Sequence, residues 1–221
     1  MQQDGIHKVG TDGVLLGSWF MPHDERHILD IGTGTGVIAL MAAQRTTARV
    51  TALDADPSAV ALAEKNFEGS PWSDRVRAVH QRLQGFQPED RYSHILSNPP
   101  FFLDSLLPDD PARLRQRHAE NLPFHELAEG VIGLLAPEGR FSVILPRREG
   151  EQFAAVAAGS GLFMRRLCMV HPKEGKPPHR LLMEFRRAGG ALETDTLYIM
   201  TAEAAYTAAY RALGKDFYLG F

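Results

Sequence analysis

Apolar runs alternate with amphipathic segments along most of the chain, and this pattern predicts the secondary structure. Short apolar runs typical of strands fall at 27–31, 49–54, 75–79, 94–97, 139–146, 163–170 and 180–185. Segments with apolar residues at helical spacing fall at 35–45, 57–67, 123–136 and 149–158. This alternation of strands and helices predicts an α/β fold, in which a mostly parallel sheet has helices on both faces.

The remaining segments are less regular. A short strand is expected at 196–200 and a helix over 203–213, close to the C-terminus. The segments 99–122 and 171–179 mix proline with charged residues, and we expect both to be irregular. Long loops within a compact domain usually serve a function.

The bulk composition suits a single globular domain of 221 residues. No apolar run approaches the ~20 residues that span a bilayer, and residues 1–10 lack the apolar core of a signal peptide. Cys168 is the only cysteine, so the chain cannot form an internal disulfide, and we interpret this residue as a buried small hydrophobe. A cytoplasmic location is expected.

The charge is unevenly distributed along the chain. Its net value of −3, with a pI of about 6.3, argues against a protein that coats nucleic acid. However, residues 1–112 carry nine Lys or Arg against fifteen Asp or Glu, whereas residues 140–187 carry ten against four. The second region could form a basic face that contacts nucleic acid, or its arginines could be solvated ends of strands and helices. Charge alone leaves both readings open.

A glycine-rich turn follows the first predicted strand, in the stretch LDIGTGTG at 29–36. Gly32, Gly34 and Gly36 allow a close approach of the backbone to a ligand. A turn of this kind between a strand and a helix is typical of nucleotide-type cofactor sites.

Two acidic residues distinguish this turn from a dinucleotide site. Asp30 would repel a pyrophosphate but suits a cationic group, such as the amino group of a methionine moiety. Asp54 ends the second predicted strand, where a carboxylate can accept both hydroxyls of a ribose. Together these features indicate S-adenosylmethionine. Asp56 is a competing ribose ligand, but its position before Pro57 suits a helix cap better.

A second candidate site lies in SNPPF, at the end of the fourth predicted strand. An exocyclic aromatic amine or an amide nitrogen is a poor nucleophile, because its lone pair is delocalised. The side-chain oxygen of Asn98 and the carbonyl of Pro99 could accept its N–H bonds, and Pro100 fixes the backbone. Phe101 could stack on a flat substrate. A turn ending a strand before two core phenylalanines is the simpler alternative.

At this point the sequence resembles a known family, the bacterial tRNA(Val) adenine-N6 methyltransferases. The segments that carry the resemblance are KVGTDGVLLGSW (8–19), LDIGTGTG (29–36), SPW followed by R (70–75), SNPPF (97–101), PHRLLMEF (178–185) and YTAAYRALGKDFYLGF (206–221). The resemblance implies a Rossmann-like class I methyltransferase fold, with a seven-stranded, mostly parallel sheet whose last strand is antiparallel. It also implies S-adenosylmethionine as donor, S-adenosylhomocysteine as product and tRNA as substrate.

The resemblance also implies roles for individual residues. Those expected at the cofactor are Lys8, Thr11, Asp12, Asp30, Gly32, Thr33, Gly34, Gly36, Asp54, Ala55, Arg82, Leu83 and Asn98. Those expected to receive the adenine are Asn98, Pro99, Pro100 and Phe101. Those expected to hold RNA are Arg113, Arg115, Arg117, Arg147, Arg148, Lys173, Lys176 and Arg180. Thr11 or Asp12 could instead cap a helix over 14–19.

The chain departs from the family pattern at three places. Arg82 stands where members usually have an acidic residue for the cofactor's adenine amino group, and an arginine cannot accept that hydrogen bond. Phe101 stands where many relatives have tyrosine. Members also usually carry a further segment before residue 8. Because this sequence lacks that segment, we expect it to bind RNA more weakly.

We expect one domain over 1–221, with a cofactor-side segment at 1–20, the cofactor and NPPF core at 29–146, and the rest of the sheet with the basic face at 147–221. Alternative functions are an N2-guanine rRNA methyltransferase, a protein glutamine methyltransferase, and a non-catalytic RNA-binding or folding factor. We expect no metal, no membrane association and no obligatory protein partner. The sequence leaves open whether the protein is a monomer or a dimer.

Overall fold

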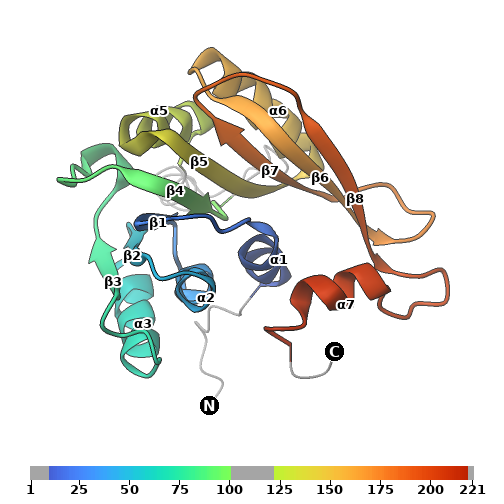
Figure 1. The fold of residues 1–221 in the computed structure, drawn as a ribbon, viewed down its shortest axis with the longest axis horizontal. Helices are drawn as coiled ribbons and strands as arrows, with labels where there is room; N and C mark the ends of the chain where they lie inside the picture. Colours follow the sequence, from blue (N-terminus) through green and yellow to red (C-terminus); the bar gives the residue numbers. More distant parts are fainter. Residues whose placement is uncertain (1–9, 101–121, 219–221) are drawn as a thin grey trace, which may run out of the picture.

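The computed structural model describes residues 10–100 and 122–218, which form an eight-stranded sheet covered by helices (Figure 1). The strands are β1 (His27–Ile31), β2 (Arg49–Asp54), β3 (Val76–His80), β4 (Tyr92–Ser97), β5 (Leu135–Pro146), β6 (Phe163–Lys173), β7 (Arg180–Arg186) and β8 (Glu193–Met200). The helices are α1 (Thr11–Trp19), α2 (Val37–Arg45), α3 (Pro57–Glu68), the 3₁₀ turn η1 (Leu83–Gly85), α5 (Phe124–Leu134), α6 (Arg147–Gly159) and α7 (Ala208–Gly214).

The strand order is β3-β2-β1-β4-β5-β7-β6-β8. Neighbours from β3 to β5 are parallel, and β7 runs antiparallel to both β5 and β6. The predicted fold class is confirmed, but the sheet has eight strands rather than seven. The additional strand is β8, which lies parallel to β6 at the edge of the sheet. Strand order reverses between β1 and β4, so ligands are expected at the carboxyl ends of these two strands.

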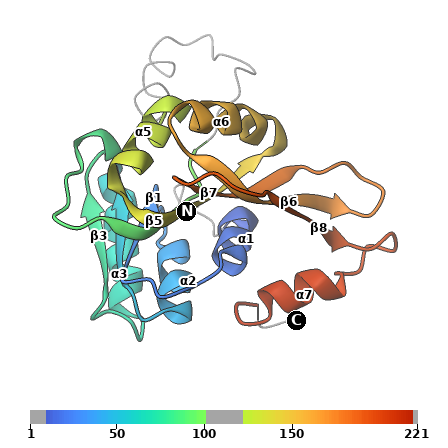
Figure 2. The ribbon, with the colours of Figure 1, turned by 45° about the horizontal axis from the view of Figure 1, so that its top comes forward.

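The two faces of the sheet carry separate apolar cores. Helices α1, α2, α3 and α7 lie on one side, and α5 and α6 on the other (Figure 2). Leu16, Ala39 and Ala63 belong to the first core, whereas Leu127 and Phe153 belong to the second. Because β1 faces both cores, it is buried from Ile28 to Ile31. A rigid central strand of this kind holds the turn that follows it.

The predicted helix over 203–213 is wrong in its first half, because α7 begins only at Ala208. Before it, Met200 and Tyr206 form an isolated antiparallel bridge, and the chain turns between them. The side chain of Thr207 accepts a hydrogen bond from the Tyr210 N–H and caps the helix. This bridge and cap outweigh the helical preference of Glu203, Ala204 and Ala205.

Two further local predictions need correction. The N-cap of α1 is Gly10, and no side chain of the described residues caps this helix, so the capping interpretation of Thr11 and Asp12 is wrong. The segment 171–179 is irregular only in part, because β6 continues to Lys173, where it pairs with β8. The predicted cap at Asp56 is confirmed, since its side chain accepts a hydrogen bond from the Ser58 N–H.

Cys168 lies in β6 with only 2% of its surface exposed, as expected for a small core hydrophobe. Burial raises the pKa of its thiol to about 12, so the thiol stays protonated and unreactive at neutral pH. Over residues 10–100 and 122–218, no helix is both long and apolar enough to cross a membrane.

Candidate active site

The turn between β1 and α2 is built from glycines with left-handed backbone conformations. Gly32, Gly34 and Gly36 have φ angles of +72°, +54° and +81°, which residues with a side chain rarely adopt. The N–H groups of Gly32 and Thr33 donate to the Leu53 carbonyl of β2, at 2.8 and 3.1 Å. A Cβ added to Gly32 or Gly34 would meet no atom within 4 Å. The turn is therefore fixed to the sheet and borders open space.

Gly36 is constrained more severely than the other two glycines, because its added Cβ would lie 2.4 Å from a ring carbon of Phe67. We expect Gly36→Ala to lower the free energy of unfolding by about 2 kcal/mol, through backbone strain and overlap with this ring. Urea unfolding measures this change. Gly34→Ala is the matched control, because Gly34 has a similar φ and its added Cβ would contact no atom of the described residues. We expect this variant to lower the free energy of unfolding by about 1 kcal/mol. Equal losses in both variants would contradict a role for the Phe67 contact.

Asp30 lies on β1 directly behind the turn and is fully buried. Its Oδ2 accepts a hydrogen bond from the Thr33 hydroxyl at 2.6 Å, while its Oδ1 is buried without a hydrogen bond from any described residue. Burial raises the pKa of Asp30 to about 7; the Thr33 hydrogen bond opposes this shift, and the charge of Asp54 adds to it. Asp30 therefore changes charge near neutral pH, and its ionised form favours a nearby cation.

Asp54 closes the other side of the turn, at the carboxyl end of β2. Its Oδ2 accepts a hydrogen bond from the Gly34 N–H and its Oδ1 accepts one from the Asp56 N–H, each at 2.9 Å. A carboxylate oxygen has a second lone pair, so both oxygens can still accept from a diol. The two backbone bonds orient the side chain in advance of any ligand.

A hollow of about 90 Å³ lies at the carboxyl ends of these strands. The predicted cofactor residues that line it are Gly32, Asp54, Ala55, Arg82 and Leu83. Pro99 and Pro100 line it from the other side, so the two sequence motifs meet here. Three features suit S-adenosylmethionine: the open glycine turn, the preoriented carboxylate of Asp54, and the buried Oδ1 of Asp30, which accepts no hydrogen bond from the described residues. We propose that the ribose would bind Asp54 and that the cationic end would lie towards Asp30.

Arg82 belongs to the same hollow, immediately before η1. Arg82 therefore lies in the same hollow as Gly32 and Asp54, and its contact with the cofactor stays a prediction. Because a guanidinium cannot accept a hydrogen bond, Arg82 would have to contact the cofactor in another way than an acidic residue does.

Asn98 is the first residue after β4, and it lines a larger cleft of about 1350 Å³. Its side-chain Oδ1 is buried and accepts no hydrogen bond from any residue that the structure describes. Pro99 and Pro100 line both this cleft and the smaller hollow. A buried acceptor without a partner costs free energy, so the cleft holds an oxygen that is suited to an N–H donor of a ligand.

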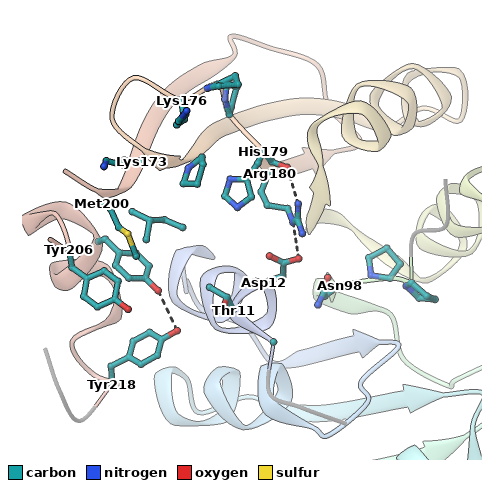
Figure 3. Close-up of a pocket in the computed structure, with 18 residues that line it drawn as sticks. Thr11, Asp12, Asn98, Lys173, Lys176, His179, Arg180, Met200, Tyr206 and Tyr218 are labelled. Atoms are coloured by element: carbon teal, nitrogen blue, oxygen red, sulfur yellow. Dashed lines mark hydrogen bonds and ion pairs between the residues drawn. The ribbon is translucent and has the colours of Figure 1, made fainter. Parts of the chain in front are cut away.

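Asp12 and Arg180 form an ion pair across the cleft (Figure 3). The Nε of Arg180 donates to the Oδ2 of Asp12 at 2.8 Å, and both side chains are largely buried. This contact joins α1 to the start of β7. Asp12 therefore forms an ion pair and does not cap its helix. Nearby, burial lowers the pKa of His179, so this imidazole is neutral at pH 7.

The structure brings some of the predicted RNA-binding residues together and separates others. Lys173, Lys176 and Arg180 line the cleft with Asn98. Arg147 and Arg148 are exposed at the start of α6 and do not line it. The Arg147 side chain forms an ion pair with Glu151 at 2.9 Å. The remaining predicted residues lie outside the described part of the chain, namely Lys8, Phe101, Arg113, Arg115 and Arg117.

A group of tyrosines at the far end of the cleft was not among the predicted site residues. Tyr206, Tyr210 and Tyr218 line it together with Met200. Tyr206 lies on the turn after β8, Tyr210 lies on α7, and Tyr218 lies beyond the end of α7. Their spacing in the tail, with two tyrosines four residues apart, was the available signal. Across the described ranges, no group of three or more His, Cys, Asp or Glu side chains could hold a metal ion.

Solved structures with the same architecture are methyltransferases. A predicted O-methyltransferase, protein Atu636 from Agrobacterium tumefaciens, superposes with a TM-score of 0.73 at 19% identity, covering 92% of this chain and 95% of that one. The glycopeptide N-methyltransferase MtfA with S-adenosylmethionine gives a TM-score of 0.61 at 13% identity, covering 85% and 100%. A family model described as "Methyltransferase small domain" matches residues 8–109. The chain therefore has a methyltransferase fold.

Relatives with closer sequences identify the family within this class. A tRNA1(Val) (adenine(37)-N6)-methyltransferase from Phocaeicola vulgatus is 44% identical over 212 residues, covering 96% of this chain and 91% of the relative. One from Vibrio cholerae is 41% identical over 212 residues, covering 96% and 88%. The chain belongs to the tRNA1(Val) (adenine(37)-N6)-methyltransferase family.

Proposed function

We propose that this enzyme methylates the exocyclic N6 of adenine 37 in the anticodon loop of tRNA1(Val). S-adenosylmethionine supplies an electrophilic methyl group when bound. The observation that carries the proposal is the buried Oδ1 of Asn98, which accepts no hydrogen bond from the described residues, in a cleft that also contains Lys173 and Lys176. The names of the relatives support the choice of base and of tRNA.

The chain's own contribution to the chemistry is positioning and electrostatics. The N6 lone pair of adenine is delocalised into the ring, so the amine is a weak nucleophile. The amine would donate one hydrogen bond to the Asn98 Oδ1 and a second to the Pro99 carbonyl. These two hydrogen bonds would favour localisation of the lone pair on the nitrogen. A strong base is not required, because a methylated, positively charged amine readily loses a proton to water. Fixed acceptors of this kind typically supply a large share of the rate enhancement.

Loop adenines suit such a cleft because they unstack at low cost and can enter a pocket. Phosphates flanking the base would then lie near Lys173, Lys176 and Arg180. We further propose that residues 1–221 act as one domain and that the enzyme works in the cytoplasm, where tRNA is modified.

The lysines of the cleft provide a quantitative prediction. If Lys173 and Lys176 each neutralise one phosphate, their joint replacement by alanine should weaken tRNA binding about tenfold at low salt. The slope of log affinity against log salt should also become shallower by about 1.4, since each contact to a single strand contributes about 0.7. Fluorescence anisotropy at several KCl concentrations measures both. Lys65→Ala, which removes an exposed charge on α3, is the control and should change neither quantity; an unchanged slope in the double variant would exclude these contacts.

The function itself is tested by incubating the protein with labelled donor and separate pools of tRNA, rRNA and release factor. Nucleoside mass spectrometry should detect N6-methyladenosine in the tRNA pool only, and mapping should assign it to position 37. N2-methylguanosine in rRNA or methylglutamine in the release factor would replace the proposal by another substrate class.

A further inference from the structure

The three cleft tyrosines form a packed aromatic group with one exposed member. The ring centroids of Tyr206 and Tyr210 lie 5.4 Å apart at an angle of 46°, and the hydroxyls of Tyr210 and Tyr218 are 3.4 Å apart. Tyr210 is only 5% exposed, whereas Tyr206 is 44% exposed. Burial raises the pKa of the Tyr210 hydroxyl, which therefore stays protonated. Tyr210 thus supports the ring of Tyr206 from behind.

The backbone that carries Tyr206 is fixed before any ligand arrives. The bridge between Met200 and Tyr206 ties it to the end of β8. The Thr207 N–H donates to the Ile199 carbonyl at 3.0 Å, and the Thr201 N–H donates to the Ala205 carbonyl at 2.8 Å. An aromatic ring on a rigid support loses little conformational entropy on binding.

The size and charge of the cleft fit more than one nucleotide. Its volume of about 1350 Å³ exceeds the ~300–1,000 Å³ of a pocket for a small ligand. Figure 3 shows Tyr206 and Tyr218 at one end and Asn98 at the other, with Lys173 and Lys176 on the β6–β7 hairpin towards the same end of the cleft as the tyrosines. A planar aromatic surface next to two cations suits a base with its phosphate.

We propose that Tyr206, with Lys173 and Lys176, forms a second nucleotide subsite that stacks a base neighbouring the target adenine. This inference rests on the proposed function, because it assigns a place to the RNA next to the base that Asn98 receives. It makes Tyr206 a binding residue for the substrate and Tyr210 its positioning residue.

The experiment uses the full chain and an anticodon stem-loop RNA. Tyr206→Ala should raise the Kd and the KM for this RNA about tenfold and leave kcat and the Kd for S-adenosylhomocysteine within about twofold. Tyr206→Phe keeps the ring and should behave like the wild type. In a second measurement, 5-iodouridine replaces the nucleotide on either side of the target adenine. Irradiation of the wild-type complex should crosslink one of these positions to the peptide that contains Tyr206.

The outcomes separate the inference from the proposed function. If the wild type forms N6-methyladenosine in the stem-loop but Tyr206→Ala matches it in Kd and KM, the subsite is refuted and the function stands. A crosslink only to peptides without Tyr206 refutes it as well, even if the alanine variant fails to fold. If the wild type methylates no tRNA, the proposed function fails first.

Discussion

Asn98→Ala is expected to lower kcat for tRNA methylation by about 100- to 1000-fold, which is typical for the loss of one preorganised group that acts in the transition state. The reason is that Oδ1 of Asn98 is the buried acceptor at the substrate side, without a hydrogen bond from any described residue. Cofactor affinity should change by no more than about twofold. Single-turnover methylation and calorimetry with S-adenosylhomocysteine measure the two effects separately.

Asn98→Asp is the matched control for this prediction, because it keeps an acceptor oxygen in the same position and replaces the amide nitrogen by a second acceptor oxygen, with a negative charge. We expect it to retain far more activity than the alanine variant. Thermal unfolding of both variants checks that the turn after β4 is intact. Substantial turnover by a folded Asn98→Ala protein would show that the amide oxygen is not required, and the acceptor would have to be found elsewhere in the cleft.

The parts of the fold that the sequence predicts well are those in which local pattern and tertiary environment agree. Strand β1 reads as a continuous apolar run because both of its faces are buried. The glycine turn is recognisable because only glycine tolerates its positive φ angles. The position of Asp54 is also predictable, because it is the last residue of the apolar run that forms β2.

The features that the sequence does not predict depend on contacts between distant segments. Asp12 and Arg180 are separated by 168 residues, and Asp12 looks like a capping residue until the ion pair is seen. Strand β8 is longer than expected because pairing with β6 extends it through the exposed residues 193–195. Tyr206 joins the cleft only because its turn folds back onto β8.

The second large effect concerns the pH dependence of stability, and it comes from Asp30. Its pKa of about 7 in the folded protein lies above the usual value of 3.8. Between these values the folded protein holds a proton that the unfolded chain has lost, so the free energy of unfolding falls as pH rises from about 4 to 7. Above pH 7 this contribution no longer changes.

Asp30→Asn cannot lose a proton, and its amide oxygen can still accept from Thr33. At pH 8 we therefore expect the variant to be more stable than the wild type by about 2–4 kcal/mol in the absence of cofactor. At pH 4 the two proteins should be equally stable. Urea unfolding at pH 4, 6 and 8 measures the difference. A constant difference across this range would show that the carboxyl does not titrate near neutrality.

The same substitution should weaken cofactor binding while it stabilises the fold. The cationic amino group of S-adenosylhomocysteine favours the ionised form of Asp30, so wild-type affinity should increase about tenfold from pH 6 to pH 8, with proton release at pH 6. Asp30→Asn should bind about 10- to 100-fold more weakly at pH 8 and show a smaller pH dependence. Calorimetry in two buffers of different ionisation enthalpy detects the released proton. If the variant binds S-adenosylhomocysteine as tightly as the wild type at pH 8, the charge of Asp30 has no part in binding the cofactor. Asp30 would then only stabilise the turn.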